Sequence, residues 1–114
     1  MRGKVYLTNA FSLSMVNPPE KIIVYEEKPE NIKQMIQNGF ESAVGHESTA
    51  KLLSQLLSVN VPVNRQEIKL KYGDKLIVFQ LMQRLSEGKI LDEEELKKIG
   101  YRFLIVEIVY GEVM

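Results

Sequence analysis

Short apolar runs alternate along this chain with polar stretches, a pattern typical of a domain that mixes strands and helices. Runs rich in Val, Ile and aromatic residues predict strands, and apolar residues spaced three and four apart predict helices. We therefore expect strands at residues 4–7, 21–26, 65–70, 76–82 and 101–110. Helices are expected from Pro29 to about Gly39, from the turn at His46 to about Val59, and at 92–99.

The run at 76–82 (LIVFQLM) is almost wholly apolar, which predicts a strand covered on both faces. The preceding run at 65–70 alternates apolar and polar residues, and the turn at Tyr72-Gly73-Asp74 predicts that the two runs pair as a hairpin. Gln80 is the one polar break in the second run, and a buried amide needs partners from protein or ligand. The long run at 101–110 is expected to be a central strand.

The predicted order is β-β-α-α-β-β-α-β, which indicates an α/β (α+β) fold. Its five strands would form one mixed sheet flanked by about three helices, and the pattern leaves the strand order open. A length of 114 residues fits one domain spanning 1–114.

The amino-acid composition excludes several kinds of functional site. The chain has no Cys and one His, which excludes disulfides, a thiol nucleophile and a conventional structural zinc site. No signal peptide and no apolar run of membrane-spanning length is expected, so we predict a cytoplasmic protein without membrane contact. Lys plus Arg and Asp plus Glu both total 15, which argues against a general binder of long DNA or RNA. Any phosphate must therefore be bound by a few local cations.

The turn Gly45-His46-Glu47-Ser48-Thr49 is the most informative stretch for function. A helix N-terminus suits an anion, histidine exchanges protons near neutral pH, and Gly45 is expected to allow unusual backbone angles. The alternative is that His46 is a surface or capping residue, and that Ser48 and Thr49 only cap the helix.

Other polar residues lie where predicted strands end. Asn9 and Ser12 follow the first strand, where they either meet a ligand or form a plain turn. Arg84 and Glu87 follow the strand at 76–82 and either act on a phosphate or form a surface ion pair.

Four blocks resemble the signature of the viral ring nucleases, small anti-CRISPR proteins that counter type III CRISPR immunity and have cellular relatives. The blocks are KVYLTNAFS at 4–12, GHESTAKLL at 45–53, NRQEIKL at 64–70 and QRLSEGKIL at 83–91. Residues 18–40 do not match closely, and Ser14, Glu47 and Ser86 differ from the family's usual Asn, Asp and Glu.

The resemblance implies a homodimer that binds cyclic tetra-adenylate across its interface. It implies metal-independent cleavage without a cofactor, in which a ribose 2′-OH attacks the adjacent phosphorus and leaves a 2′,3′-cyclic phosphate on linear di-adenylate. Degrading this messenger would switch off type III CRISPR signalling.

Carried over position by position, the resemblance makes His46 the acid that protonates the leaving 5′-oxygen. Arg84 would stabilise charge on the phosphate, and Glu87 would assist proton transfer or position the ribose, in a loop at 83–90 that closes over the ligand. The substrate-binding residues it implies are Asn9, Ser12, Ser48, Thr49, Arg65 and Gln80. Two other hypotheses are a non-catalytic binder or sensor of cyclic oligoadenylate, and a viral interaction protein without a nucleotide ligand.

Overall fold

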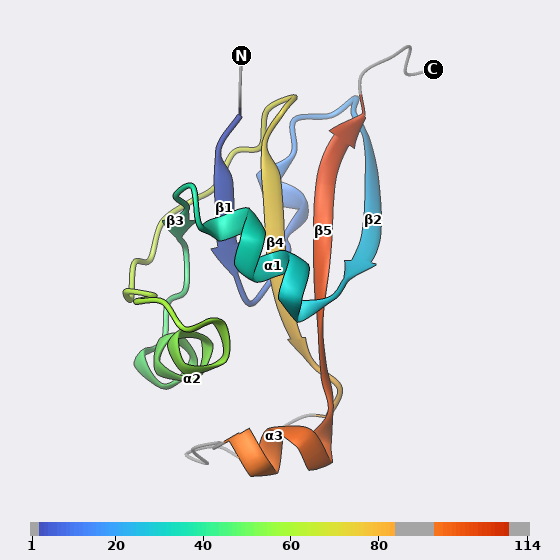
Figure 1. The fold of residues 1–114 in the computed structure, drawn as a ribbon. Coiled ribbons are helices and arrows are strands. Elements are labelled where there is room, and N and C mark those ends of the chain that lie inside the picture. Colours follow the sequence, from blue (N-terminus) through green and yellow to red (C-terminus); the bar gives the residue numbers. More distant parts are fainter. Residues whose placement is uncertain (1–2, 84–92, 110–114) are drawn as a thin grey trace.

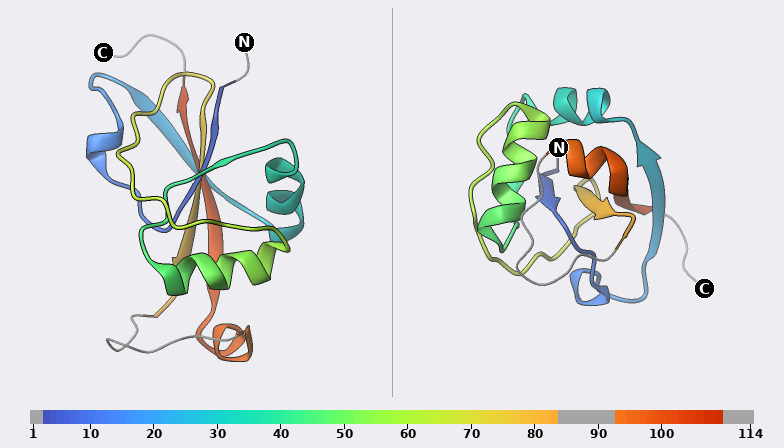
Figure 2. Two further views of the ribbon diagram at one scale, coloured as in Figure 1. Left: turned by 90° about the vertical axis from the view of Figure 1, so that its left-hand side faces the viewer. Right: turned by 90° about the horizontal axis from the view of Figure 1, so that it is seen from below.

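A single mixed β-sheet organises the molecule, with helices α1 and α2 on one face and a short 3-10 helix, η1, on the other (Figures 1 and 2). The structure is a computed structural model that describes residues 3–83 and 93–109. Its elements are β1 (Val5–Thr8), η1 (Leu13–Met15), β2 (Lys21–Glu27), α1 (Pro29–Ile36), β3 (Glu41–Ser42), α2 (Glu47–Leu57), β4 (Lys75–Leu81), α3 (Glu93–Ile99) and β5 (Tyr101–Val109).

The five strands lie in the order β2-β5-β4-β1-β3. Strand β1 runs parallel to both β3 and β4, whereas β5 runs antiparallel to both β4 and β2. Thr8 at the end of β1 pairs with Val78 in β4. The carboxyl ends of these two parallel strands therefore lie at the same edge of the sheet, which is where ligands commonly bind in sheets with parallel strands.

Both faces of the sheet are packed against apolar side chains. On one face, Leu7, Ile77 and Phe103 pack with residues of α1 and α2. On the other face, Val78 and Val106 pack with residues of the loop between α2 and β4 and of the segment around η1. This double cover explains the apolar run at 76–82, which forms the middle strand β4 with both of its faces buried.

Several expectations from the sequence are confirmed. The domain is α+β, with one five-stranded mixed sheet and three helices in the described part of the chain. Helix α1 begins at Pro29 with Glu30 in its first turn, and α3 is followed by Gly100 at a φ of 88°. No helix in the ranges described is both long and apolar enough to cross a bilayer.

The predicted strand at 65–70 is wrong, and so is its hairpin with β4. The alternation was real, because Ile68 and Leu70 are buried while their neighbours are exposed. However, β1 and β5 occupy both edges of β4, so no edge is left for a hairpin partner. The segment instead packs on the face of the sheet that carries η1. There the Leu70 N–H donates to the carbonyl of Met15 at 2.8 Å.

One strand of the sheet, β3, takes the place of the strand expected at 65–70. It is a two-residue strand between α1 and α2 that the sequence pattern did not indicate. It pairs with β1 through Tyr6↔Glu41 and Leu7↔Ser42. The order of elements is therefore β-β-α-β-α-β-α-β.

Candidate functional site

A polar hollow lies at the carboxyl edge of the parallel strands β1 and β4. It has a volume of about 270 Å³ and brings together three predicted binding residues: Asn9 just after β1, Thr49 in the first turn of α2, and Gln80 in β4. Phe79 and Leu81 complete its lining. A lining that contains two amides, a hydroxyl and apolar residues can offer a ligand both hydrogen bonds and apolar contact.

His46 lies at the start of this helix, three residues before Thr49. It is the N-cap residue of α2, with φ −128° and ψ 134°, and its carbonyl accepts a hydrogen bond from the Ala50 N–H at 3.0 Å. The imidazole is exposed and makes no capping hydrogen bond. The side chain therefore does not cap the helix, whereas its exposure agrees both with the surface alternative and with access for a ligand.

Among the described residues, no side chain caps the first turn of α2. The N–H groups at this end of a helix lack partners within the helix and carry its positive dipole end. Ser48 and Thr49 belong to this first turn, and Ser48 is exposed while Thr49 is half-buried. Within the described residues, the structure gives neither hydroxyl a capping role at α2.

Arg65 contacts the loop just before His46. Its Nε donates to the Gly45 carbonyl at 2.9 Å. A Cβ at position 45 would lie 3.0 Å from Cγ of Arg65, so glycine makes room for this side chain. The expected reason for this glycine was wrong, because Gly45 does not have a positive φ; instead, its missing side chain lets Arg65 pack closely against it.

Buried Ser42 joins the two loops that carry His46 and Arg65. Its hydroxyl donates to the Pro62 carbonyl at 2.6 Å and accepts from the Val44 N–H at 3.2 Å. Its own carbonyl accepts from the side-chain amides of Asn64 at 2.9 Å and Gln66 at 2.8 Å. These bonds set the position of Arg65 beside Gly45 without any strand pairing.

Two other predicted residues differ from expectation. Gln80 is exposed rather than buried, because β4 leaves the packed core near its carboxyl end, and its Oε1 accepts a hydrogen bond from Nε of Arg102 at 2.6 Å. Ser12 caps η1, accepting from the Ser14 N–H at 3.3 Å, and is not among the residues lining the hollow. For Ser12 the structure thus favours the turn interpretation.

The predicted Arg84 and Glu87, with most of the predicted loop at 83–90, lie outside the described residues. Their roles remain predictions. Strand β4 ends at Leu81, so the described chain leads from the hollow directly into this segment.

Arg102 is a polar residue at this edge that sequence reasoning missed. It stands directly opposite Gln80 on the neighbouring strand β5. The signal was present, because Arg102 is a charged residue within an apolar strand, but its meaning depends on knowing that β4 and β5 pair in this register.

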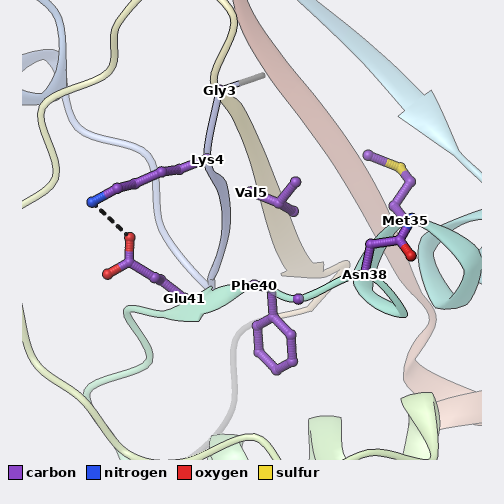
Figure 3. Close-up of a pocket in the computed structure, with 8 residues that line it drawn as sticks. Gly3, Lys4, Val5, Met35, Asn38, Phe40 and Glu41 are labelled. Carbon is purple, nitrogen blue, oxygen red and sulfur yellow. Dashed lines mark ion pairs between the residues drawn. The ribbon is translucent and has the colours of Figure 1, made fainter. Parts of the chain in front are cut away.

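A larger hollow of about 500 Å³ lies at the opposite end of β1 (Figure 3). Its lining includes Val5, Met35 and Phe40, and an ion pair in which Nζ of Lys4 lies 3.2 Å from Oε2 of Glu41. Hydrogen bonding to Glu41 raises the pKa of Lys4. None of the predicted site residues lines this hollow.

The described residues contain no group of three or more His, Asp or Glu side chains arranged to hold a metal ion. Among the described residues that line the first hollow, the polar groups are the amides of Asn9 and Gln80 and the hydroxyl of Thr49. His46, at the N-cap of the helix that carries Thr49, and Arg65, bonded to the Gly45 carbonyl, are not among these lining residues.

Fold and site together define a small α+β domain with a polar hollow where two parallel strands of a mixed sheet meet a helix N-terminus. Residues 5–103 match a family model described as STIV B116-like, and the chain belongs to this family. A structural neighbour is B116 of Sulfolobus turreted icosahedral virus, with a TM-score of 0.79 and 32% identity. That match covers 92% of this chain and 99% of the neighbour.

Relatives in sequence include uncharacterized viral proteins. Protein 26 of Sulfolobus islandicus filamentous virus is 41% identical, over 95% of this chain and 94% of its own length. Protein ORF117 of Acidianus two-tailed virus is 35% identical, over 92% and 93%. The uncharacterized protein YddF of Bacillus subtilis is 30% identical, over 68% and 74%, so similar chains also occur outside viruses.

Proposed function

We propose that this protein is a ring nuclease that cleaves cyclic tetra-adenylate to linear di-adenylate without a metal ion. The observation that carries the proposal is the convergence of Asn9, Thr49 and Gln80 on one hollow at the helix end that bears His46. These residues come from separate parts of the chain and meet only in the fold. A helix N-terminus suits a phosphate, and amides can hydrogen-bond base edges or phosphate oxygens.

The sequence blocks that resemble ring nucleases support this proposal. The blocks at 4–12 and 45–53 contribute Asn9 and Thr49 to the hollow, and the block at 64–70 places Arg65 on Gly45. The chain has a formal net charge of zero, so its contacts to phosphate must come from such local groups. The block at 83–91 lies outside the described residues except for Gln83.

In the proposed reaction a ribose 2′-oxygen forms a bond to the adjacent phosphorus while the bond from phosphorus to the 5′-oxygen breaks. His46, as imidazolium, gives its proton to the departing 5′-oxygen. The 2′-OH proton passes to Glu87 or to water, and Arg84 stabilises charge on the phosphate. No water is consumed, and the product carries a 2′,3′-cyclic phosphate.

We propose further that the protein acts as a homodimer with the ring at its interface. Cyclic tetra-adenylate has approximate two-fold symmetry, which matches an isologous contact between two copies. Two symmetry-related sites would then cut the ring twice and release two molecules of di-adenylate. By removing the messenger, the protein would switch off type III CRISPR signalling.

The test is a cleavage assay on cyclic tri-, tetra- and hexa-adenylate with EDTA present, with products separated by chromatography. The wild type should convert the four-membered ring to di-adenylate, and His46→Ala should lower the rate by about 10²–10⁴, the usual contribution of a general acid. A matched control is Lys51→Ala, an exposed residue one turn further along α2, which should keep full activity.

Other outcomes would favour the remaining hypotheses. Tight binding with the ring intact after long incubation, and unchanged in His46→Ala, would indicate a binder or sensor. No rise in melting temperature with any cyclic oligoadenylate would contradict nucleotide binding altogether and favour an interaction protein. Undiminished cleavage by His46→Ala would remove His46 from the mechanism.

A further inference from the structure

Gln80 and Arg102 form a cross-strand pair at the edge of the hollow. They stand opposite each other on β4 and β5, and Nε of Arg102 donates to Oε1 of Gln80 at 2.6 Å. A guanidinium has donors only, so the atom of Gln80 that it contacts must be the carbonyl oxygen. The pair therefore fixes the orientation of the Gln80 amide, with its oxygen facing Arg102 and its NH₂ group facing away.

The NH₂ group of Gln80 has no hydrogen-bond acceptor among the described residues. Gln80 is exposed and lines the hollow together with Asn9 and Thr49. With its oxygen bonded to Arg102, the Gln80 amide offers its NH₂ group as a hydrogen-bond donor, for which the described part of the chain supplies no acceptor. An amide fixed in this way can bond only to a hydrogen-bond acceptor on the ligand. A freely rotating amide could turn to bond to either a donor or an acceptor.

Arg102 is itself held between two strands. Its Nη1 lies 3.9 Å from Oε1 of Glu26 on β2, on the side away from Gln80. The Arg102 side chain is 38% exposed, so its charge is partly shielded from solvent. A guanidinium contacting both a carboxylate and an amide is more restricted than a free surface arginine.

We propose that Arg102 is a positioning residue of this site, which orients Gln80 so that its NH₂ group donates to a phosphate oxygen of the bound cyclic nucleotide. The inference rests on the proposed function and adds a residue to it. A phosphate oxygen is the acceptor that fits, because Arg102 brings positive charge to the same edge of the sheet.

The test compares Arg102→Met, Arg102→Lys and Gln80→Glu in the cleavage assay, reading KM and kcat separately. Arg102→Met should raise KM about tenfold with kcat nearly unchanged, since a hydrogen bond to a fixed donor is lost but the reacting groups stay. Arg102→Lys should recover part of the loss, because an ammonium also donates to Oε1. Gln80→Glu should bind more weakly still, because a carboxylate offers no donor and repels phosphate.

Coupling between the two side chains separates positioning from a general effect of charge. If Arg102 acts through Gln80, adding Arg102→Met to Gln80→Leu should raise KM no further. The matched control is Lys4→Met, which removes a cation at the opposite end of β1 and should leave KM unchanged. Thermal melts of each variant identify any that are not folded, and Gln80→Glu keeps a partner for Arg102 if Arg102→Met fails to fold.

A folded Arg102→Met with the wild-type KM, or additive effects in the double variant, would overturn the inference while leaving the proposed function intact. A wild-type protein that neither binds nor cuts any cyclic oligoadenylate would overturn both.

Discussion

The close contact between Gly45 and Arg65 shows how one residue controls a neighbouring loop. A methyl group at position 45 would meet Cγ and Nε of Arg65 at 3.0 and 3.2 Å. Arg65 is exposed and flexible, so it can move away at little cost in stability. Such a movement would disturb the hydrogen bond from Nε to the Gly45 carbonyl, in the loop just before His46.

We therefore predict that Gly45→Ala weakens binding of cyclic tetra-adenylate by about tenfold, since one charge-assisted contact is displaced. Its melting temperature should stay close to that of the wild type. Calorimetric titration with the ring and a thermal melt measure the two effects. Loss of stability together with unchanged affinity would contradict this account of Gly45.

Tyr25 gives a second residue-level prediction, away from the site. Burial is the main cause that raises its pKa to about 12, with a further contribution from its hydrogen bond to Glu107 at 2.6 Å. The native pKa exceeds the unfolded value of about 10, so the neutral phenol stabilises the fold below about pH 10. This contribution is lost as the pH rises from about 10 to about 12.

Urea unfolding of the wild type and Tyr25→Phe at several pH values between 8 and 12 tests the prediction. The difference in unfolding free energy between them should fall across the upper part of this range. In Glu107→Gln, absorbance titration should show Tyr25 ionising at a lower pH than in the wild type, though still above 10, because burial is the larger cause. A Tyr25 that titrates normally in the wild type would contradict it.

Residue-level reasoning from the sequence selected three of the residues that line the hollow, whose binding roles remain predictions. Asn9 and Thr49 were identifiable because each follows a strand end or begins a helix, and both positions depend only on local pattern. Gln80 was found for the wrong reason, since it is exposed. Arg102 was missed because its partner lies 22 positions away, across a strand pairing that no local pattern reveals.

Among the elements, the segment between α2 and β4 is held by side-chain hydrogen bonds and single backbone hydrogen bonds, without pairing as a strand. Its alternating pattern resembled a strand, since Ile68 and Leu70 are buried at every second position. Alternation reports which side chains face the core and does not report which backbone groups pair. Strands β1 and β5 pair with the two edges of β4 and leave none for this segment. That pairing depends on the whole sheet and cannot be predicted from the sequence of the segment alone.

Ser42 should be the most sensitive residue of this arrangement. It is 4% exposed, and Ser42→Ala would remove the partner of the Pro62 carbonyl and the Val44 N–H. We predict a loss of about 1–3 kcal/mol in unfolding free energy, the usual cost of leaving buried polar groups unpaired. The bonds from Asn64 and Gln66 to the Ser42 carbonyl are kept in this variant. Because the lost bond to Pro62 helps to hold the loop that leads to Arg65, affinity for cyclic tetra-adenylate should fall as well.

Chemical unfolding of Ser42→Ala and of the control Ser14→Ala, whose side chain is exposed, measures the effect. The control should change stability by less than about 0.5 kcal/mol, as surface substitutions usually do. Equal losses in both variants would mean that Ser42 has no special role in joining the loops.

At the scale of the whole molecule, the strand order explains which expectations held. The apolar run at 76–82 predicted a doubly covered strand, and β4 occupies the middle of the sheet. The run at 101–110 also became an interior strand, between β4 and β2. The length and apolar character of these runs were enough to indicate interior positions, whereas the two-residue β3 was too short to leave a pattern.

The proposed pairing of two copies leads to a prediction for the assembled protein. If the ring is bound across a two-fold interface, titration calorimetry should give one ring for every two chains. Light scattering should show a dimer whose stability rises when the ring is added to His46→Ala, which binds without cutting. One ring per chain, or a monomer that cuts at full rate at high dilution, would contradict a shared site.

The interior position of β1 has a consequence for how the protein is made. This first strand lies between β3 and β4, and the Lys4 N–H bonds to Asp74, 70 positions later in the chain. During synthesis the amino-terminal strand therefore leaves the ribosome long before its second neighbour exists, with both edges unsatisfied. Sheets closed by such distant partners form slowly, and unpaired edges invite contact with other chains. Refolding yield should thus decline steeply with protein concentration. A pause in translation before residue 75 should increase the binding of chaperones to the nascent chain.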